Sequence, residues 1–148
     1  MNSEGSLYLA AILAILAAVY AIVKFCHRKE TNPFLKLVVT IENEKTQQFR
    51  VYDSIARATF RQIFESLPSN LENLCLTPAE REKFCRENFD WLSPNGSTFF
   101  LEKRGDDFFV VGVCIYNRDS HDLSSFVCNF ESDRQRGGDT DRVVVRKQ

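Results

Sequence analysis

The chain has 148 residues, which is room for one ordinary domain and a short appendage. Thirteen phenylalanines supply apolar material for one well-packed core, so a disordered chain is excluded. The formal net charge of −1 creates no field that would attract phosphates, and nucleic-acid binding is therefore not expected.

Seventeen residues near the N-terminus, from Leu7 to Val23, carry no charge. As a helix they would extend over about 26 Å, close to the hydrocarbon thickness of a bilayer. The segment Met1–Ser6 lacks the positive charge of a cleavable signal peptide, so we expect a retained transmembrane helix. The expected anchor comprises Leu7, Ile12, Leu16 and Val23, followed by the bases Lys24, Arg28 and Lys29.

The basic residues lie on the C-terminal side of this segment, and lysine and arginine remain in the cytoplasm during insertion. The sequence therefore predicts a single-pass membrane protein of the signal-anchor kind, with its C-terminal domain in the cytosol. A short span suits the endoplasmic reticulum or the mitochondrial outer membrane. Cys26, at the expected membrane boundary, is a candidate for lipidation.

After the linker, two alternating segments at 35–41 and 46–52 predict a β-hairpin. A helix is expected over 55–67, and a second over roughly 78–89, where Thr77 and Glu80 form a capping box. Strands are expected at 97–103 and 106–116, joined by a tight turn at Arg104 and Gly105. The expected divisions are an anchor at 1–27, a linker at 28–34, a cytosolic domain at 35–131 and a polar tail at 132–148. Within the tail, the three valines at 143–145 could add an edge strand or stay loose.

Neighbouring phenylalanines occur in both of the later strands, and adjacent residues of a strand face opposite sides of the sheet. Phe108 and Phe109 begin a segment that is apolar on both faces, so we expect it to be covered on each side. The fold class predicted is α+β: a transmembrane helix followed by a small, mostly antiparallel sheet packed by helices. Residues 123–131 fit both helical and strand spacing, which leaves their structure open.

The segment TFFLEKRGDDFFVVGVCIYNRDSHDLSSFVCNF, residues 98–130, resembles the central hairpin and following helix of longin domains. The order of elements is likewise similar to longin-like and profilin-like sandwiches. The resemblance implies such a sandwich, with a helix after the hairpin.

The five cysteines include no pair at the C-x-x-C spacing of zinc sites, and their number is odd. We therefore expect reduced, mostly buried thiols, and neither a metal nor a cofactor. A minimal enzyme would need Cys114 or Cys128 together with His121, but a loop histidine and core thiols explain these residues more simply.

The function expected is a membrane-anchored, non-catalytic interaction or adaptor module that holds a protein partner or a second copy of itself. One alternative is a small structural or assembly subunit of a larger membrane complex, including a viral envelope protein. Another is the Cys/His enzyme. The expected partner surface comprises Phe84, Phe89, Phe109, Val111 and Val113.

Overall fold

The computed structural model describes residues 11–19, 31–42 and 47–147. It divides into two compact units, residues 1–31 and 32–148, which we describe separately. In the first unit, residues 11–19 are helical. The second unit contains the sheet and its hydrophobic core.

The predicted transmembrane helix is wrong. In the parts of the chain that the structure describes, no helix has both the length and the apolar character needed to cross a bilayer. The nine described helical residues, which include Ile12 and Leu16, rise only about 14 Å, whereas a span needs about 20 residues. The predictions of a single-pass protein of the signal-anchor kind, placed in the endoplasmic reticulum or the mitochondrial outer membrane, are wrong for the same reason. Of the other residues named for the anchor, Leu7, Val23, Lys24, Arg28 and Lys29 lie outside the described residues, as does Cys26.

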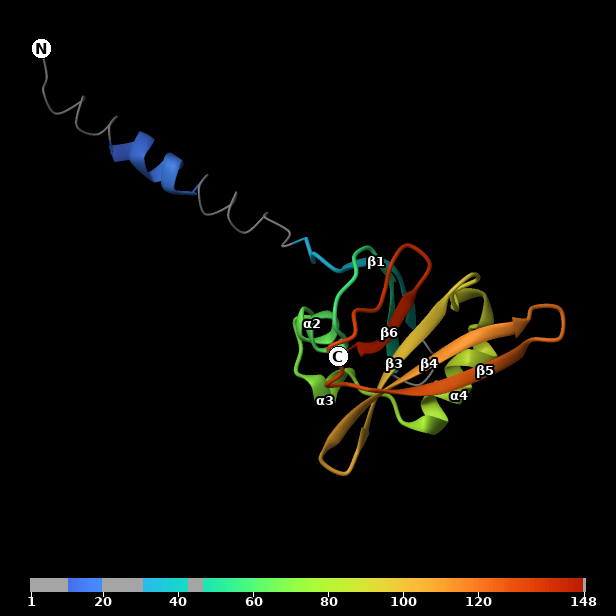
Figure 1. The fold of residues 1–148 in the computed structure, drawn as a ribbon. Coiled ribbons are helices and arrows are strands. Elements are labelled where there is room, and N and C mark those ends of the chain that lie inside the picture. The colour runs from blue at the N-terminus through green and yellow to red at the C-terminus, as the bar shows by residue number, and fades with distance from the viewer. Residues whose placement is uncertain (1–10, 20–30, 43–46, 148) are drawn as a thin grey trace, which may run out of the picture. The chain divides into compact units, whose positions relative to one another are not determined.

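The second unit is an α+β fold built on one mixed sheet (Figure 1). Its strand order is β1-β2-β6-β3-β4-β5, and every neighbouring pair is antiparallel except β3 and β6. The strands are β1 (Leu35–Glu42), β2 (Gln48–Ser54), β3 (Ser97–Arg104), β4 (Asp107–Asn117), β5 (Asp122–Asn129) and β6 (Arg142–Lys147).

The C-terminal segment is part of the sheet centre, which corrects the prediction of a polar tail at 132–148. Strand β6 lies between β2 and β3 and joins the two antiparallel halves of the sheet. Val143 and Val145 face one side of the sheet and Val144 the other, and all three are buried. The three valines suit a strand covered on both faces, although the preceding residues are polar.

Residues 122–129 form strand β5, which settles the ambiguity between helix and strand. They pair antiparallel with β4 from Phe109 to Asn117. The helix implied by the resemblance to longin domains is therefore absent at this position. Pairing with β4 decides the outcome, because either spacing fits the isolated sequence.

Short helices flank the sheet: α2 (Phe60–Glu65), α3 (Leu71–Leu74), α4 (Pro78–Glu87) and a 3-10 turn (Phe89–Trp91). Helix α4 begins with the expected capping box, in which Thr77 and Glu80 bind each other's backbone amides. Helix α2 begins five residues later than expected, at Phe60. Before it, Ala58 forms an isolated antiparallel β-bridge with Arg136, in which the amide of Ala58 donates to the carbonyl of Arg136 at 2.9 Å.

The adjacent phenylalanines of β3 divide the core between the two faces, as the alternation predicts. Phe99 packs edge-on against Phe60 of α2, with ring centroids 5.0 Å apart. Phe100 packs in the same way against Phe84 of α4, at 5.8 Å. Helices α2 and α3 therefore cover one face, which we call the α2 face, and α4 covers the other, the α4 face.

An extra residue in β1 changes which face its side chains occupy. The pairing register with β2 shifts between Leu37 and Val39, which leaves Val38 as a bulge. Leu35 consequently joins the core of the α2 face, while Val39 packs against that of the α4 face. Leu37 is left 50% exposed at the sheet edge.

One carboxylate is buried inside the α4 face. Glu102 of β3 is 1% exposed, and its Oε1 accepts a hydrogen bond from Nε of Arg81 of α4 at 2.6 Å. Its Oε2 accepts from Arg104 at 3.3 Å. Because an unpaired buried charge is costly, this contact fixes α4 against the sheet.

We expect Glu102→Gln to lower the free energy of unfolding by about 3 kcal/mol, because Arg81 would lose its carboxylate while remaining largely buried. Glu65→Gln is the matched control, since Glu65 pairs with Arg61 and both side chains are 47% exposed. The control should lose less than about 1 kcal/mol. Urea denaturation of both variants measures the difference, and equal losses would contradict a structural role for the buried pair.

Candidate functional site

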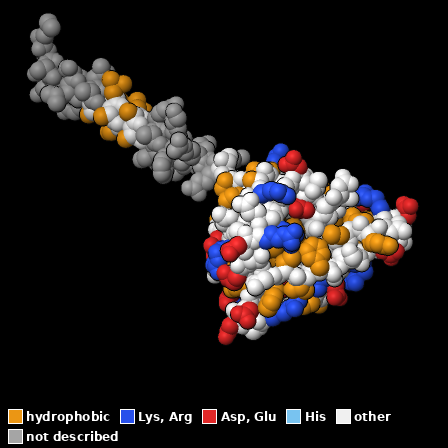
Figure 2. Space-filling view, in the orientation of Figure 1, with side chains coloured by type: hydrophobic (Ala, Val, Ile, Leu, Met, Phe, Trp, Pro, Cys, Tyr) orange, Lys and Arg blue, Asp and Glu red, His pale blue; other side chains and the backbone are white. Residues whose placement is uncertain are grey.

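Strand β5 is the open edge of the sheet. It is last in the strand order, and seven of its eight residues are exposed. From Leu123 to Asn129 it contains neither a charged residue nor a proline, the features that commonly protect an edge strand. Val127 is 54% exposed, and Leu123 and Phe126 are each 37% exposed. Figure 2 shows hydrophobic side chains gathered over the β4 and β5 part of this view.

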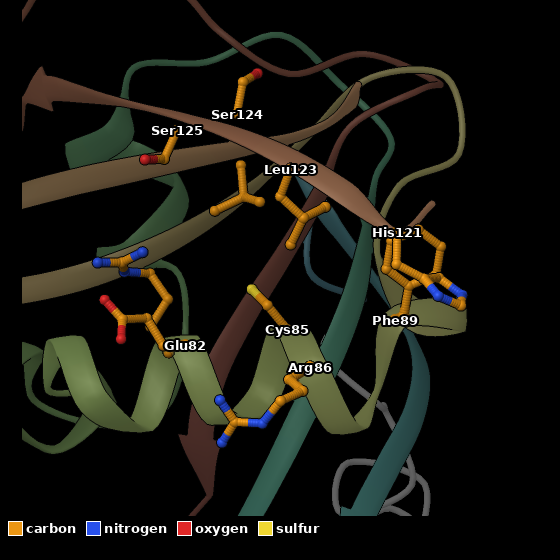
Figure 3. A pocket seen from close by; sticks show the side chains of 10 residues that line it. Glu82, Cys85, Arg86, Phe89, His121, Leu123, Ser124 and Ser125 are labelled. Atoms are coloured by element: carbon orange, nitrogen blue, oxygen red, sulfur yellow. The ribbon is translucent and has the colours of Figure 1, made fainter. Parts of the chain in front are cut away.

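A groove of about 420 Å³ runs between β5 and α4 (Figure 3). Helix α4 runs along the strand in the opposite direction, so that Glu82 lies below Ser125 and Phe89 lies near His121. The groove is lined by Arg81, Glu82, Cys85, Arg86, Phe89, Val113, His121, Leu123, Ser124 and Ser125.

Helix α4 is held in place along its buried side and at its first turn. Phe84 packs between Phe49 and Phe100, with ring centroids at 5.3 and 5.8 Å. At the first turn, Glu80 accepts hydrogen bonds from the Thr77 amide and from the side chains of Gln47 and Arg146. Burial raises the pKa of the Glu80 carboxyl, but the hydrogen bonds from Thr77 and Arg146 and the positive charge of Arg146 outweigh it and hold the pKa below its ordinary value. These contacts position α4 as one wall of the groove.

The far end of the groove is closed by the β4–β5 turn. His121 has a left-handed backbone conformation, with φ of 56°. Its ring packs edge-on against Phe89, with centroids 4.3 Å apart. Asn117 stabilises the turn, because its side-chain oxygen accepts the amide of Asp119 at 3.0 Å. The sequence around His121 is polar and indicates a loop, so it does not predict that the ring packs against Phe89.

The opposite side of β5 carries a second exposed apolar group. Phe126 lies across Gly112 of β4 and approaches Phe99, with ring centroids 6.3 Å apart. A Cβ atom at position 112 would lie 2.3 Å from the Phe126 ring, so only glycine leaves room for it. A second hollow, of about 440 Å³, is lined by Asp106, Asp107, Phe108, Phe109, Val127, Cys128, Asn129 and Glu131.

The residues expected to form a partner surface are distributed between the core and the two hollows. Phe84 and Val111 are buried in the core of the α4 face. Phe89 and Val113 belong to that core but also line the groove beside α4. Phe109 is half-buried and lines the second hollow. Their contact with a partner stays a prediction. The exposed residues Leu123 and Val127 were missed, because 123–131 had no assigned structure.

The structure separates the residues considered for a Cys/His enzyme. Cys128 packs against the core of the α2 face, and Cys114 shares that side of β4 and lies 3.2 Å from Ser97 Oγ. His121 instead lines the groove on the α4 face. The cysteine that shares the groove with it is Cys85, whose pKa burial raises to about 11. A thiol of that pKa is protonated at neutral pH and is a poor nucleophile.

Within the described ranges, no group of three or more His, Cys, Asp or Glu side chains is placed to hold a metal ion.

Stability should fall as the pH rises above about 9. Burial raises the thiol pKa of Cys75 and of Cys85 from 9.0 to about 11. Between pH 9 and 11 the folded state keeps these two protons while the unfolded thiols lose them. The stability that the protonated thiols contribute is therefore present below pH 9 and is lost between pH 9 and 11. When the pH is raised from about 8 to about 10.5, we expect the free energy of unfolding to fall less in the double variant Cys75→Ala/Cys85→Ala than in the wild type. Urea denaturation across this range measures both slopes, and equal slopes would contradict the assignment.

No protein-family model matches this chain, and no curated protein or solved structure is significantly similar to it.

Proposed function

We propose that this chain is a protein-interaction module that holds an extended segment of a partner along β5. The observation that carries the proposal is the open edge of β5 beside a preformed groove. An added strand would hydrogen-bond to the free side of β5, and its alternate side chains would enter the groove. Main-chain bonds would supply affinity and the groove would supply selectivity.

The other edge of the sheet supports this choice by contrast. Strand β1 has a bulge at Val38 and carries charged side chains at Lys36 and Glu42. Bulges and charges discourage the addition of a further strand. Strand β5 has neither feature between Leu123 and Asn129, although it exposes comparable apolar surface. The difference favours β5 as the binding edge.

The groove's chemistry suits binding better than covalent catalysis. Its thiol, Cys85, has a pKa raised to about 11 by burial, and its imidazole, His121, packs against Phe89. Leu123 and Val113 offer apolar contacts, while Glu82 and Arg86 offer charges of opposite sign. A mixed apolar and charged lining is typical of surfaces that select a protein segment.

A photo-reactive amino acid introduced at Leu123 tests the proposal. In cells that make the full chain, we expect irradiation to produce one discrete protein adduct, since Leu123 lines the groove. Arg86→Glu in the same chain should reduce the adduct. The matched control is the same photo-reactive residue at Leu37, which is also exposed but lies on β1. Equal adducts from the two positions, or none from position 123, would contradict the proposed site.

A further inference from the structure

We infer that the chain has a second binding site, which holds the phosphate group of a phosphate monoester. The site is a small pocket between the sheet and the loop that joins α2 to α3, and it shares no lining residue with the groove beside β5. The inference therefore goes beyond the proposed function and is tested independently of it. Three features of the described residues support it: the bases that line the pocket, their unpaired donors and the size of the space.

The pocket lies where β2 and β6 meet the segment from Leu67 to Leu74. Arg50 is two residues before Tyr52, and Lys147 is two residues after Val145, and both of these neighbours belong to the core of the α2 face. Side chains two residues apart in a strand share a face, so the two bases lie on that face as well. Because Arg50 pairs with Val145, Lys147 is its diagonal neighbour on the adjacent strand.

The pocket is basic, although the chain as a whole is almost neutral. Arg50, Arg146 and Lys147 line it, and none of its lining residues is acidic. Arg146 is already paired, because it donates a hydrogen bond to Glu80. Neither Arg50 nor Lys147 forms an ion pair with another residue that the structure describes. Two uncompensated positive charges on the wall of one pocket favour a ligand with two negative charges.

Several hydrogen-bond donors of the lining also have no acceptor. The Nε of Arg50 is buried and makes no hydrogen bond within the described ranges. The same is true, over those ranges, of hydrogen bonds from the side chains of Tyr52, Ser69 and Lys147, which all line the pocket. Buried polar groups are nearly always paired, so an unpaired donor of this kind indicates a bound partner. A set of donors without a carboxylate is complementary to a ligand that presents acceptor oxygens.

The size and charge of the pocket select a phosphate over a carboxylate. Its volume is about 110 Å³. One water needs about 15 Å³ of such space, so there is room for the five heavy atoms of a phosphate group. A guanidinium binds two phosphate oxygens at once, and an ammonium binds as a point charge. A carboxylate has a single charge and two oxygens, and would leave one base and its donors unpaired.

A titration of the full, ¹⁵N-labelled chain with inorganic phosphate tests the inference. The ionic strength is held constant with sodium chloride, so that screening does not change. We expect the Nε–H signal of Arg50 to shift and to saturate with a Kd on the order of 1 mM. The Nε–H signal of Arg118, which is exposed in the β4–β5 turn, should not shift. Acetate over the same range should give no saturation.

Charge removal at the pocket provides a second measurement. Arg50→Gln and Lys147→Gln should each weaken phosphate binding about tenfold, because each removes one of the two unpaired charges. Arg118→Gln is the matched control, since it removes the same charge away from the pocket, and it should leave the affinity unchanged. Circular dichroism checks folding. Lys147 is near the end of β6, so Lys147→Gln remains a test if Arg50→Gln does not fold.

The source of the phosphate is distinguished with two further probes. Glycerol 3-phosphate presents the group on a soluble molecule, and phosphatidylcholine vesicles containing phosphatidylinositol 4-phosphate present it on a lipid. Binding of either probe that Arg50→Gln or Lys147→Gln weakens supports the site and identifies the source. Absence of a saturable Arg50 shift up to about 50 mM phosphate would overturn the inference. It would also be overturned if acetate bound as tightly as phosphate, or if Arg118→Gln lost as much affinity as the pocket variants.

Discussion

The structure depends on a sheet whose central strands are apolar on both faces. Phe99 and Phe100, which are neighbours in β3, cannot be buried by one layer, so each needs its own cover. Helices α2 and α3 bury the first and α4 buries the second. Six strands are about 24 Å across, whereas a helix with its side chains is about 10 Å wide. These few short helices cover the centre and leave β5 open.

The same packing that completes the core shapes the groove. Helix α4 is held by Phe84, by the buried pair of Arg81 with Glu102, and by the hydrogen bonds that Glu80 accepts from two other segments. With the helix fixed this firmly, its outer side forms a rigid wall opposite β5. The residues that stabilise the fold are therefore distinct from those that we propose for contact with a partner, namely Leu123, Val127, Glu82 and Arg86.

Local sequence patterns predicted the structure correctly where all the interacting residues lie in one segment of the chain. In the capping box, the side chains of Thr77 and Glu80 accept hydrogen bonds from backbone amides of the same helix turn. The burial of neighbouring phenylalanines on opposite faces follows from the alternation of side chains along a strand. The first two strands pair antiparallel as predicted, but β2 lies at Gln48–Ser54 and not at 46–52, and the bulge at Val38 was not expected. A bulge inserts a residue without changing composition, so alternation alone does not reveal it.

The sequence by itself determined the α+β class, the start of α4 and the division of phenylalanines between two faces, because these follow from the backbone period and from local hydrogen bonds. Tertiary structure decided the rest. Residues 123–131 fit either period until pairing with β4 made them a strand, and Val143–Val145 became a central strand only because β2 and β3 were available on both sides. The groove was equally inaccessible to sequence reasoning. It joins α4 to the outer strand of a sheet, and non-local pairing alone determines which strand is outermost.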